Sequence, residues 1–123
     1  MPKKILVVED DREVAGYIAD FLKAKTFDAK CAYDGDEAVK SINEYKPDCI
    51  LLDVQLPGSM NGINILEQTK KTNPNIKIVV ITGFVEEETE QECTKLGADG
   101  YIIKPLDFRK VGELIKEIMG KQK

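Results

Sequence analysis

The sequence contains no histidine among its 123 residues. The chain itself can therefore supply no imidazole base, no histidine metal ligand and no phosphohistidine. Cysteine is scarce, and its three copies, Cys31, Cys49 and Cys93, show no CxxC spacing. They indicate neither a disulfide framework nor a zinc site, and we expect reduced thiols in a cytoplasmic protein.

Long apolar runs and clusters of positive charge are also missing. The amino-terminal segment has four apolar residues between two lysines and three acids, which is too short for a membrane span or for the apolar region of a signal peptide. We therefore expect no membrane association. Lysine and arginine are scattered and the formal net charge is −4, which disfavours direct binding to nucleic acid.

The composition is otherwise that of an ordinary globular domain. Hydrophobic residues make up 42% of the chain and charged residues 33%, and no segment is repetitive. At 123 residues the chain is long enough to bury a hydrophobic core without disulfides or metal ions. We expect one domain over residues 1–123, with a core of about 3–119 and a short polar tail at 120–123. The expectation fits both a stand-alone domain and a domain cut from a longer protein.

Five short segments predict strands. Residues 49–52 are apolar and uncharged, which is typical of a strand buried on both faces of a parallel sheet. Residues 27–32 alternate between apolar and polar side chains, which predicts a strand at the sheet edge. The other three strands are expected at residues 5–8, 76–81 and 101–103.

Amphipathic segments between and after these strands predict five helices. Asp11 and Asp107 are expected to cap the first and the last of them, and Gly97 is expected to follow the fourth. Alternating strands and helices predict an α/β fold, a doubly wound five-stranded parallel sheet with right-handed crossovers and helices on both faces. The expected helices lie at about 14–22, 34–45, 63–73, 86–96 and 107–119.

The chemically unusual residues directly follow the expected strands. Glu9 and Asp10 follow the first strand, Asp53 the third, Thr82 the fourth and Lys104 the fifth. In open α/β sheets, ligands bind at the edge formed by the carboxyl ends of the strands. We therefore expect these five side chains to form one pocket.

Such a pocket would combine three carboxylates, which repel each other and raise at least one pKa unless a cation neutralises them. A divalent cation that prefers oxygen ligands, Mg²⁺ or Mn²⁺, fits this requirement. Beside that cation, an ionised Asp53 is a candidate nucleophile toward phosphorus. Thr82 can donate a hydrogen bond to one phosphoryl oxygen, and Lys104 can neutralise another.

Each of these residues also has a purely structural explanation. The acids at 9–11 favour a helix N-terminus through its dipole, an explanation that we prefer for Asp11 but not for Asp10. Asp53 is compatible with a helix cap or a turn, Thr82 with a simple turn, Lys104 with a surface charge and Tyr101 with core packing. Their order at successive strand ends favours the pocket.

Five short motifs occur in order along the chain. They are Val7-Val8-Glu9-Asp10-Asp11, Asp53 followed by Pro57, Thr82-Gly83, Gly100-Tyr101 and Lys104-Pro105. Each motif alone is weak, but all of them together, at strand ends, are specific. From about Lys3 to Met119 the chain resembles a response-regulator receiver domain, the phosphoacceptor part of two-component signalling.

This resemblance implies that Asp53 accepts a phosphoryl group from a sensor histidine kinase or a histidine phosphotransfer protein. It also implies a Mg²⁺ site formed by Asp10, Asp53 and the backbone carbonyl of Gln55, with Glu9 acting through water. Such a protein is a signalling switch rather than an enzyme, because it catalyses only its own phosphorylation and dephosphorylation.

The resemblance further implies that Thr82 and Lys104 bind the phosphoryl group, and that Thr82 and Tyr101 form a switch. The bond between Lys104 and Pro105 is expected to be cis. The expected strand order is 2-1-3-4-5, as in flavodoxin-like sheets. The face formed by the fourth helix, the fifth strand and the fifth helix is expected to control an output protein or domain, and a dimer that forms on phosphorylation belongs to the same expectation.

The chain departs from the family pattern after Asp53. The loop at 57–62 is one residue longer than is usual and has Asn61 where Asp is common, which we expect to alter the surface that faces the kinase. Gln55 and Phe84 occupy positions that influence the lifetime of the phosphoryl group in this family. Our hypothesis is that the bulky Phe84 hinders the attacking water and lengthens that lifetime.

The segment 86–92 contains five glutamates. A solvated helix face is the default explanation of such a charge run. The alternative is that these acids meet a basic surface on an output partner, since the fourth helix belongs to the signalling face of the family.

Three other functions remain as alternatives. A flavin or nucleotide binder with the same fold would need a phosphate cradle after the first strand, where this chain has three acids. An aspartyl phosphatase would use a second acid at the position of Gln55. A receiver fold that only binds partners would not need Asp53, Thr82 and Lys104 together.

Overall fold

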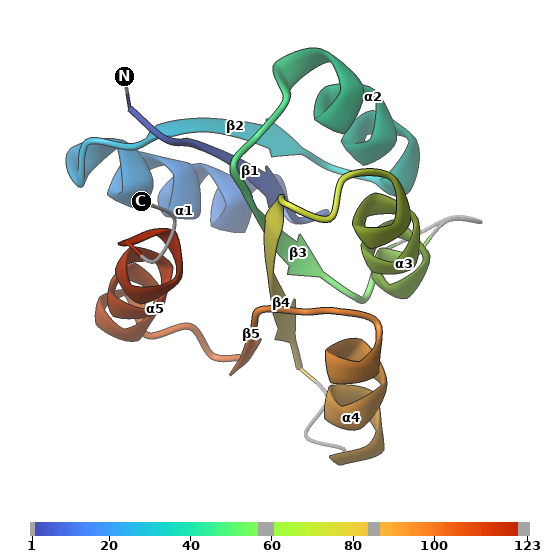
Figure 1. Cartoon of the computed structure of the whole chain (residues 1–123). Coiled ribbons are helices and arrows are strands. Elements are labelled where there is room, and N and C mark those ends of the chain that lie inside the picture. Colours follow the sequence, from blue (N-terminus) through green and yellow to red (C-terminus); the bar gives the residue numbers. More distant parts are fainter. Residues whose placement is uncertain (1, 57–60, 84–86, 121–123) are drawn as a thin grey trace.

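The computed structural model describes residues 2–56, 61–83 and 87–120. Strands and helices alternate throughout these residues, as the sequence predicts (Figure 1). The strands are β1 (Lys4–Val8), β2 (Asp28–Ala32), β3 (Cys49–Asp53), β4 (Lys77–Thr82) and β5 (Gly100–Ile103). The helices are α1 (Arg12–Ala24), α2 (Gly35–Tyr45), α3 (Gly62–Thr72), α4 (Glu87–Lys95) and α5 (Phe108–Gly120).

The strands form one parallel sheet in the order β2-β1-β3-β4-β5. This arrangement confirms the predicted doubly wound sheet and its strand order. β3 lies at the centre, and every one of its residues is buried. β2 lies at an edge and is partly exposed, which explains its alternating polar and apolar sequence.

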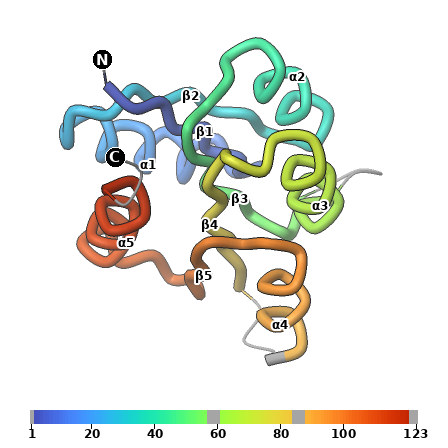
Figure 2. The backbone as a smooth tube through the Cα atoms, in the orientation of Figure 1, coloured from blue at the N-terminus to red at the C-terminus, as the bar shows by residue number. Residues whose placement is uncertain are grey.

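Helices cover both faces of the sheet (Figures 1 and 2). Because successive side chains of a strand point to opposite faces, each strand contributes to two cores. Ile5, Val7 and Leu51 pack with α1 and α5, whereas Leu6 and Leu52 pack with α2, α3 and α4. Full burial of each such side chain stabilises the fold by about 1.5–3 kcal/mol.

Two of the expected helix ends are present, and a third lies one residue earlier than predicted. Asp11 caps α1 by accepting hydrogen bonds from the backbone nitrogens of Glu13 and Val14, at 3.0 and 3.2 Å. Gly97 follows α4 with a φ of +102°, a conformation that favours glycine. α3 begins at Gly62, one residue before the predicted start, because Asn61 and Asn64 form a capping box there.

Two further expectations concern the backbone and the membrane. The bond between Lys104 and Pro105 is cis, as expected. Among the described residues, no helix combines the length and the apolar character that a membrane crossing requires.

Candidate functional site

The topology gathers the predicted site residues at one edge of the sheet. Glu9 follows β1, Asp53 ends β3, Thr82 ends β4 and Lys104 follows β5, and these four strands are neighbours. Parallel strands end at the same edge, so residues distant in sequence meet there. The backbone nitrogen of Lys104 donates to the carbonyl oxygen of Thr82 at 2.8 Å, which ties the end of β5 to the end of β4.

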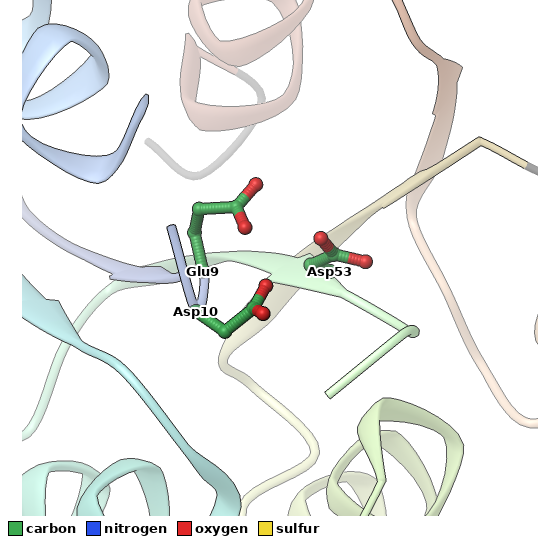
Figure 3. A group of neighbouring side chains, drawn as sticks. All are labelled: Glu9, Asp10 and Asp53. Atoms are coloured by element: carbon green, nitrogen blue, oxygen red, sulfur yellow. The ribbon is translucent and has the colours of Figure 1, made fainter. Parts of the chain in front are cut away.

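Three carboxylates form the centre of this site (Figure 3). Glu9, Asp10 and Asp53 each offer one oxygen, and these oxygens all lie within 4.8 Å of one another. Glu9 is 3% exposed and Asp53 is 2% exposed, whereas Asp10 is open to solvent. The cluster is therefore buried on one side and accessible on the other. Such a set of oxygens fits a hard divalent cation, which keeps part of its coordination shell for water or a ligand.

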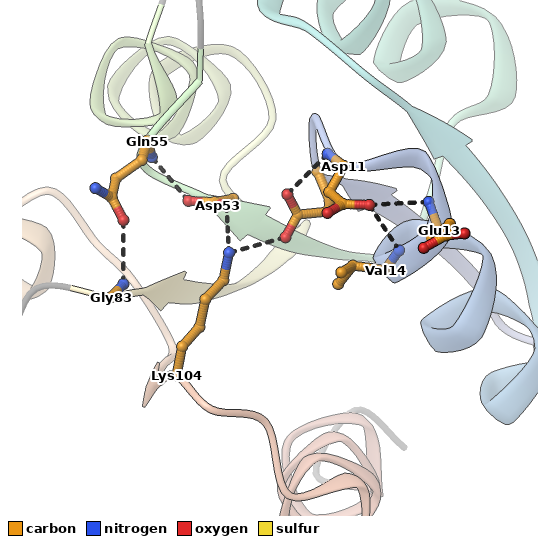
Figure 4. A network of polar contacts seen from close by, with 8 residues as sticks. Asp11, Glu13, Val14, Asp53, Gln55, Gly83 and Lys104 are labelled. Carbon is orange, nitrogen blue, oxygen red and sulfur yellow. Dashed lines mark hydrogen bonds and ion pairs between the residues drawn. The ribbon is translucent and has the colours of Figure 1, made fainter.

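Lys104 neutralises part of this charge (Figure 4). Its Nζ atom donates to Oδ2 of Asp53 at 2.8 Å and to Oε1 of Glu9 at 2.9 Å. One ammonium group forms ion pairs with two buried carboxylates, and the carboxylate of Asp10 adds a third negative charge nearby. The site therefore keeps an excess of negative charge that a bound cation would balance.

The pKa shifts follow from this arrangement. Burial raises the pKa of Glu9 above the usual carboxyl value, and the hydrogen bonds from Lys104 and from the backbone of Asp11 only partly oppose it. Burial lowers the pKa of Lys104, but the hydrogen bonds and charges of Asp53 and Glu9 outweigh it, and the pKa is raised. At neutral pH Lys104 is therefore a stable cation.

Backbone groups fix the orientation of both buried carboxylates. The nitrogen of Gln55 donates to Oδ1 of Asp53 at 2.8 Å, and the nitrogen of Asp11 donates to Oε2 of Glu9 at 3.1 Å. One oxygen of each carboxylate thus faces the backbone and the other faces Lys104. Charge-assisted hydrogen bonds of this kind hold a carboxylate in one orientation.

The start of α3 packs directly against the end of β3. A Cβ atom at Gly62 would lie 2.5 Å from the carbonyl oxygen of Asp53 and even closer to Cα of Val54. Only glycine allows this approach. The sequence analysis assigned Gly62 to a loop and missed this requirement, because it depends on contact with another segment.

Thr82 and Tyr101 have different surroundings. Thr82 is fully buried at the end of β4. Tyr101 is half-buried on β5, pairs with Val80 in the sheet register and packs against the core beneath α2, α3 and α4. The two residues lie on neighbouring strands, as the switch hypothesis requires, and their movement stays a prediction.

A contact that the sequence did not indicate involves the side chain of Gln55 (Figure 4). Its Oε1 atom accepts a hydrogen bond from the nitrogen of Gly83 at 3.2 Å. This contact joins the segment after β3 to the segment after β4. The other loop expectations, for residues 57–60, Phe84 and Glu86, lie outside the described residues.

The family model for the response regulator receiver domain matches residues 5–116. This chain belongs to that family. Receiver domains are signalling switches that work with kinases or phosphotransfer proteins and with output domains. Membership in this family accounts for the acidic cluster at the strand ends of the sheet.

Solved structures of receiver domains are closely similar over nearly the whole chain. A CheY-like receiver domain protein from Methanospirillum hungatei shares 30% identity with a TM-score of 0.94, covering 99% of this chain and 97% of the other. The receiver domain of Francisella response regulator 1452 shares 28% identity with a TM-score of 0.91, covering 98% and 99%. Borrelia burgdorferi CheY, in a complex with CheX, BeF3 and Mg²⁺, shares 28% identity with a TM-score of 0.88, covering 97% and 90%.

Proposed function

We propose that this receiver domain accepts a phosphoryl group on Asp53 from a sensor histidine kinase or a histidine phosphotransfer protein. An oxygen of Asp53 attacks phosphorus, the bond between phosphorus and the donor's imidazole nitrogen breaks, and that nitrogen keeps the electron pair. The observation that carries the proposal is the placement of Asp53. Its carboxylate ends the central strand and lies beside Glu9, Asp10 and the ammonium group of Lys104.

The carboxylate cluster is proposed as a Mg²⁺ site, which Mn²⁺ can also occupy. Asp10, Asp53 and the backbone carbonyl of Gln55 would be its ligands, and Glu9 would act through water. When bound, the ion neutralises the negative charge that builds up around phosphorus. The similar Borrelia protein, whose structure contains BeF3 and Mg²⁺, supports this assignment.

Lys104 and Thr82 are proposed to bind the phosphoryl oxygens. Lys104 already lies 2.8 Å from Asp53, so it can shift one of its hydrogen bonds to an arriving phosphoryl group. The hydroxyl of Thr82 would donate to another oxygen. The inward movement of Thr82 would leave space into which Tyr101, on the neighbouring strand, turns.

A hollow beside the site is proposed as the docking surface for the phosphoryl donor. It has a volume of about 290 Å³, and one of its lining residues, Lys104, also contacts Asp53 and Glu9 of the acidic cluster. Tyr17 lines this hollow and is 63% exposed, so its ring adds apolar surface that is available to a partner. A helix that presents a phosphohistidine would place its imidazole next to Asp53 from this surface. The remaining lining residues are Val14, Pro105, Leu106 and Phe108.

The face formed by α4, β5 and α5 is proposed to control an output protein or domain, and to form a dimer on phosphorylation. Exposed Ile103 on β5 and the exposed acids Glu88, Glu90 and Glu92 on α4 support this assignment. We also propose that residues 1–123 act as a single receiver domain in the cytoplasm. The three free cysteines support a reducing compartment.

Intact mass after incubation with acetyl phosphate tests the phosphoacceptor role. We expect a gain of about 80 Da, one phosphoryl group, that requires Mg²⁺ and is absent from Asp53→Asn. Asp20→Asn, which changes an exposed aspartate on α1, is the matched control and should still gain this mass. A gain that persists in Asp53→Asn, or no gain from acetyl phosphate and none from phosphorylated histidine phosphotransfer proteins, would overturn the proposal.

A further inference from the structure

A second hollow lies between α1, the segment that joins α1 to β2, and α5, and it shares no lining residue with the acidic cluster. Its volume is about 400 Å³, which is in the range of sites for small molecules. Figures 1 and 2 show α1 and α5 next to each other on one face of the sheet. Phe21 of α1 and Phe27, which precedes β2, line the hollow with aromatic surface.

The shape of this hollow depends on a glycine and on a ring stack. A Cβ atom at Gly112 of α5 would lie 3.1 Å from Cζ of Phe21, so the missing side chain leaves room over the Phe21 ring. Phe21 also stacks on Phe108, with ring centroids 5.2 Å apart and planes at 25°. The stack holds the Phe21 ring in place, so the hollow offers a preformed flat apolar surface.

Three cations surround this aromatic surface. Lys25 comes from the end of α1, and Arg109 and Lys116 come from α5. Among the residues that the structure describes, Glu113 is the one acid in this lining. Within the part of the chain that the structure describes, no ion pair joins these four side chains to any charged group. The lining therefore has three positive charges against one negative charge, in a chain whose net charge is −4, and Lys25 already lies over the Phe21 ring, with Nζ 5.8 Å from the ring centroid.

We propose that this hollow binds a small planar aromatic anion. The ring lies against Phe21 and Phe27, and its carboxylate, sulfonate or phosphate group lies among Lys25, Arg109 and Lys116. A neutral ring would use only the apolar surface, whereas an anion also gains charge-assisted hydrogen bonds, for which the Arg109 guanidinium has a suitable planar geometry. The proposal does not depend on phosphorylation of Asp53.

Titration of the full chain with the fluorescent probe anilinonaphthalene sulfonate tests the site. We expect saturable binding, with amide shifts in two-dimensional NMR spectra centred on Gly112. Phenylnaphthylamine, which has the same rings without the sulfonate, should bind about 3- to 10-fold more weakly. Near-ultraviolet circular dichroism verifies that the probe binds the native fold rather than a loosened one.

Charge variants of α5 locate the anion. Lys116→Glu should weaken probe binding about 3- to 10-fold, and Glu113→Gln should strengthen it about twofold. Lys110→Glu is the matched control, because it makes the same charge change at an exposed residue of α5 that does not line the hollow. We expect its affinity to stay within about twofold of the native value.

Two results would overturn the proposal. The first is an equal loss of affinity in Lys110→Glu and Lys116→Glu, which would show attraction by overall charge rather than by a site. The second is no saturable binding, or amide shifts that leave Gly112 and its neighbours unchanged. Gly112→Leu, which fills the hollow, should abolish binding. If that variant does not fold, the comparison of Lys116→Glu with Lys110→Glu still tests the proposal, because both lysines are exposed.

Discussion

The Nζ atom of Lys104 lies 2.8 Å from Oδ2 of Asp53, although β4 separates their strands in the sheet. The long lysine side chain spans this distance from the end of β5. The same nitrogen lies 2.9 Å from Oε1 of Glu9, so one cation holds the two buried carboxylates together. This arrangement makes Lys104 important for the stability of the metal-free protein as well as for the proposed chemistry.

Replacement of Lys104 by methionine should therefore destabilise the metal-free protein. The change keeps most of the apolar stem but leaves two buried carboxylates without their cation, which we expect to lower the free energy of unfolding by about 1–3 kcal/mol. Mg²⁺ should recover most of this loss, because it supplies the missing positive charge. Urea denaturation with and without Mg²⁺ measures both effects. Lys110→Met, at an exposed position, is the control, and equal stability of the two variants without Mg²⁺ would contradict the prediction.

Glu9 should make Mg²⁺ binding depend on pH. Because burial raises its pKa above the ordinary value of 4.5, Glu9 takes up a proton at a higher pH than an exposed glutamate does. The stability that its protonated form contributes is complete below the ordinary carboxyl value and is lost as the pH rises through the raised value. Above that value the ionised Glu9 adds negative charge and favours Mg²⁺.

Thermal denaturation with and without Mg²⁺, from pH 4.5 to neutrality, measures this dependence. We expect the increase in Tm on adding Mg²⁺ to become larger as the pH rises. In Glu9→Gln the increase should be smaller and should change less with pH. A native protein whose Mg²⁺ response is constant across this series would argue against a proton on Glu9.

Gly62 should tolerate no side chain. In Gly62→Ala the new Cβ would be forced against backbone atoms of Asp53 and Val54, and we expect the free energy of unfolding to fall by about 1–3 kcal/mol. Gly16→Ala is a matched control within α1, where a Cβ meets nothing within 4 Å. There we expect a gain of about 0.5–1 kcal/mol, because alanine favours the helix. Chemical denaturation measures both changes in the free energy of unfolding. Changes of opposite sign in Gly62→Ala and Gly16→Ala would support the close approach at Gly62, and an unchanged stability of Gly62→Ala would refute it.

Asp99, which directly precedes β5 at the amino ends of the strands, should contribute strongly to stability. Its Oδ2 atom accepts hydrogen bonds from Lys70 Nζ at 2.8 Å and from the backbone nitrogen of Ile78 at 2.9 Å. Asp99→Ala leaves both donors without this acceptor, and we expect a loss of about 2–3 kcal/mol in the free energy of unfolding.

A surface ion pair on α3 provides the comparison for Asp99. Nζ of Lys71 lies 3.7 Å from Oε2 of Glu67, and both side chains are much more exposed than those of Lys70 and Asp99. Removal of this pair in Lys71→Met should change stability by less than about 0.5 kcal/mol. Comparable losses in Asp99→Ala and Lys71→Met, measured by the same denaturation experiment, would contradict the role assigned to Asp99.

Most of the fold is predictable from local sequence patterns. The uncharged run 49–52 forms the central strand and the alternating segment 28–32 forms an edge strand, since burial on two faces or one leaves different patterns in the sequence. The predicted and the observed strands and helices differ only in where they begin and end. β4 begins at Lys77 rather than Ile76, and α3 begins at Gly62, because local hydrogen bonds such as the capping box of Asn61 and Asn64 decide where an element starts.

The candidate site is predictable only in part. Asp53 and Glu9 could be placed at strand ends because each follows an apolar run that ends abruptly in a carboxylate. The side-chain bridge from Gln55 to Gly83 was missed, since nothing in either local sequence indicates the other. The hollow at Phe21 and Gly112 was missed for the same reason, because α1 and the segment after it form one wall and α5, which is distant in the sequence, forms the other.

The sequence by itself determined which residues form strands, which form helices, and which polar side chains follow each strand. These properties depend on periodicity and on neighbours within a few residues. The tertiary structure decided which of those side chains meet. Lys104 reaches Glu9 across 95 residues of sequence and Asp53 across 51. Such contacts depend on strand order and register, which follow from the packing of the whole sheet rather than from any single segment.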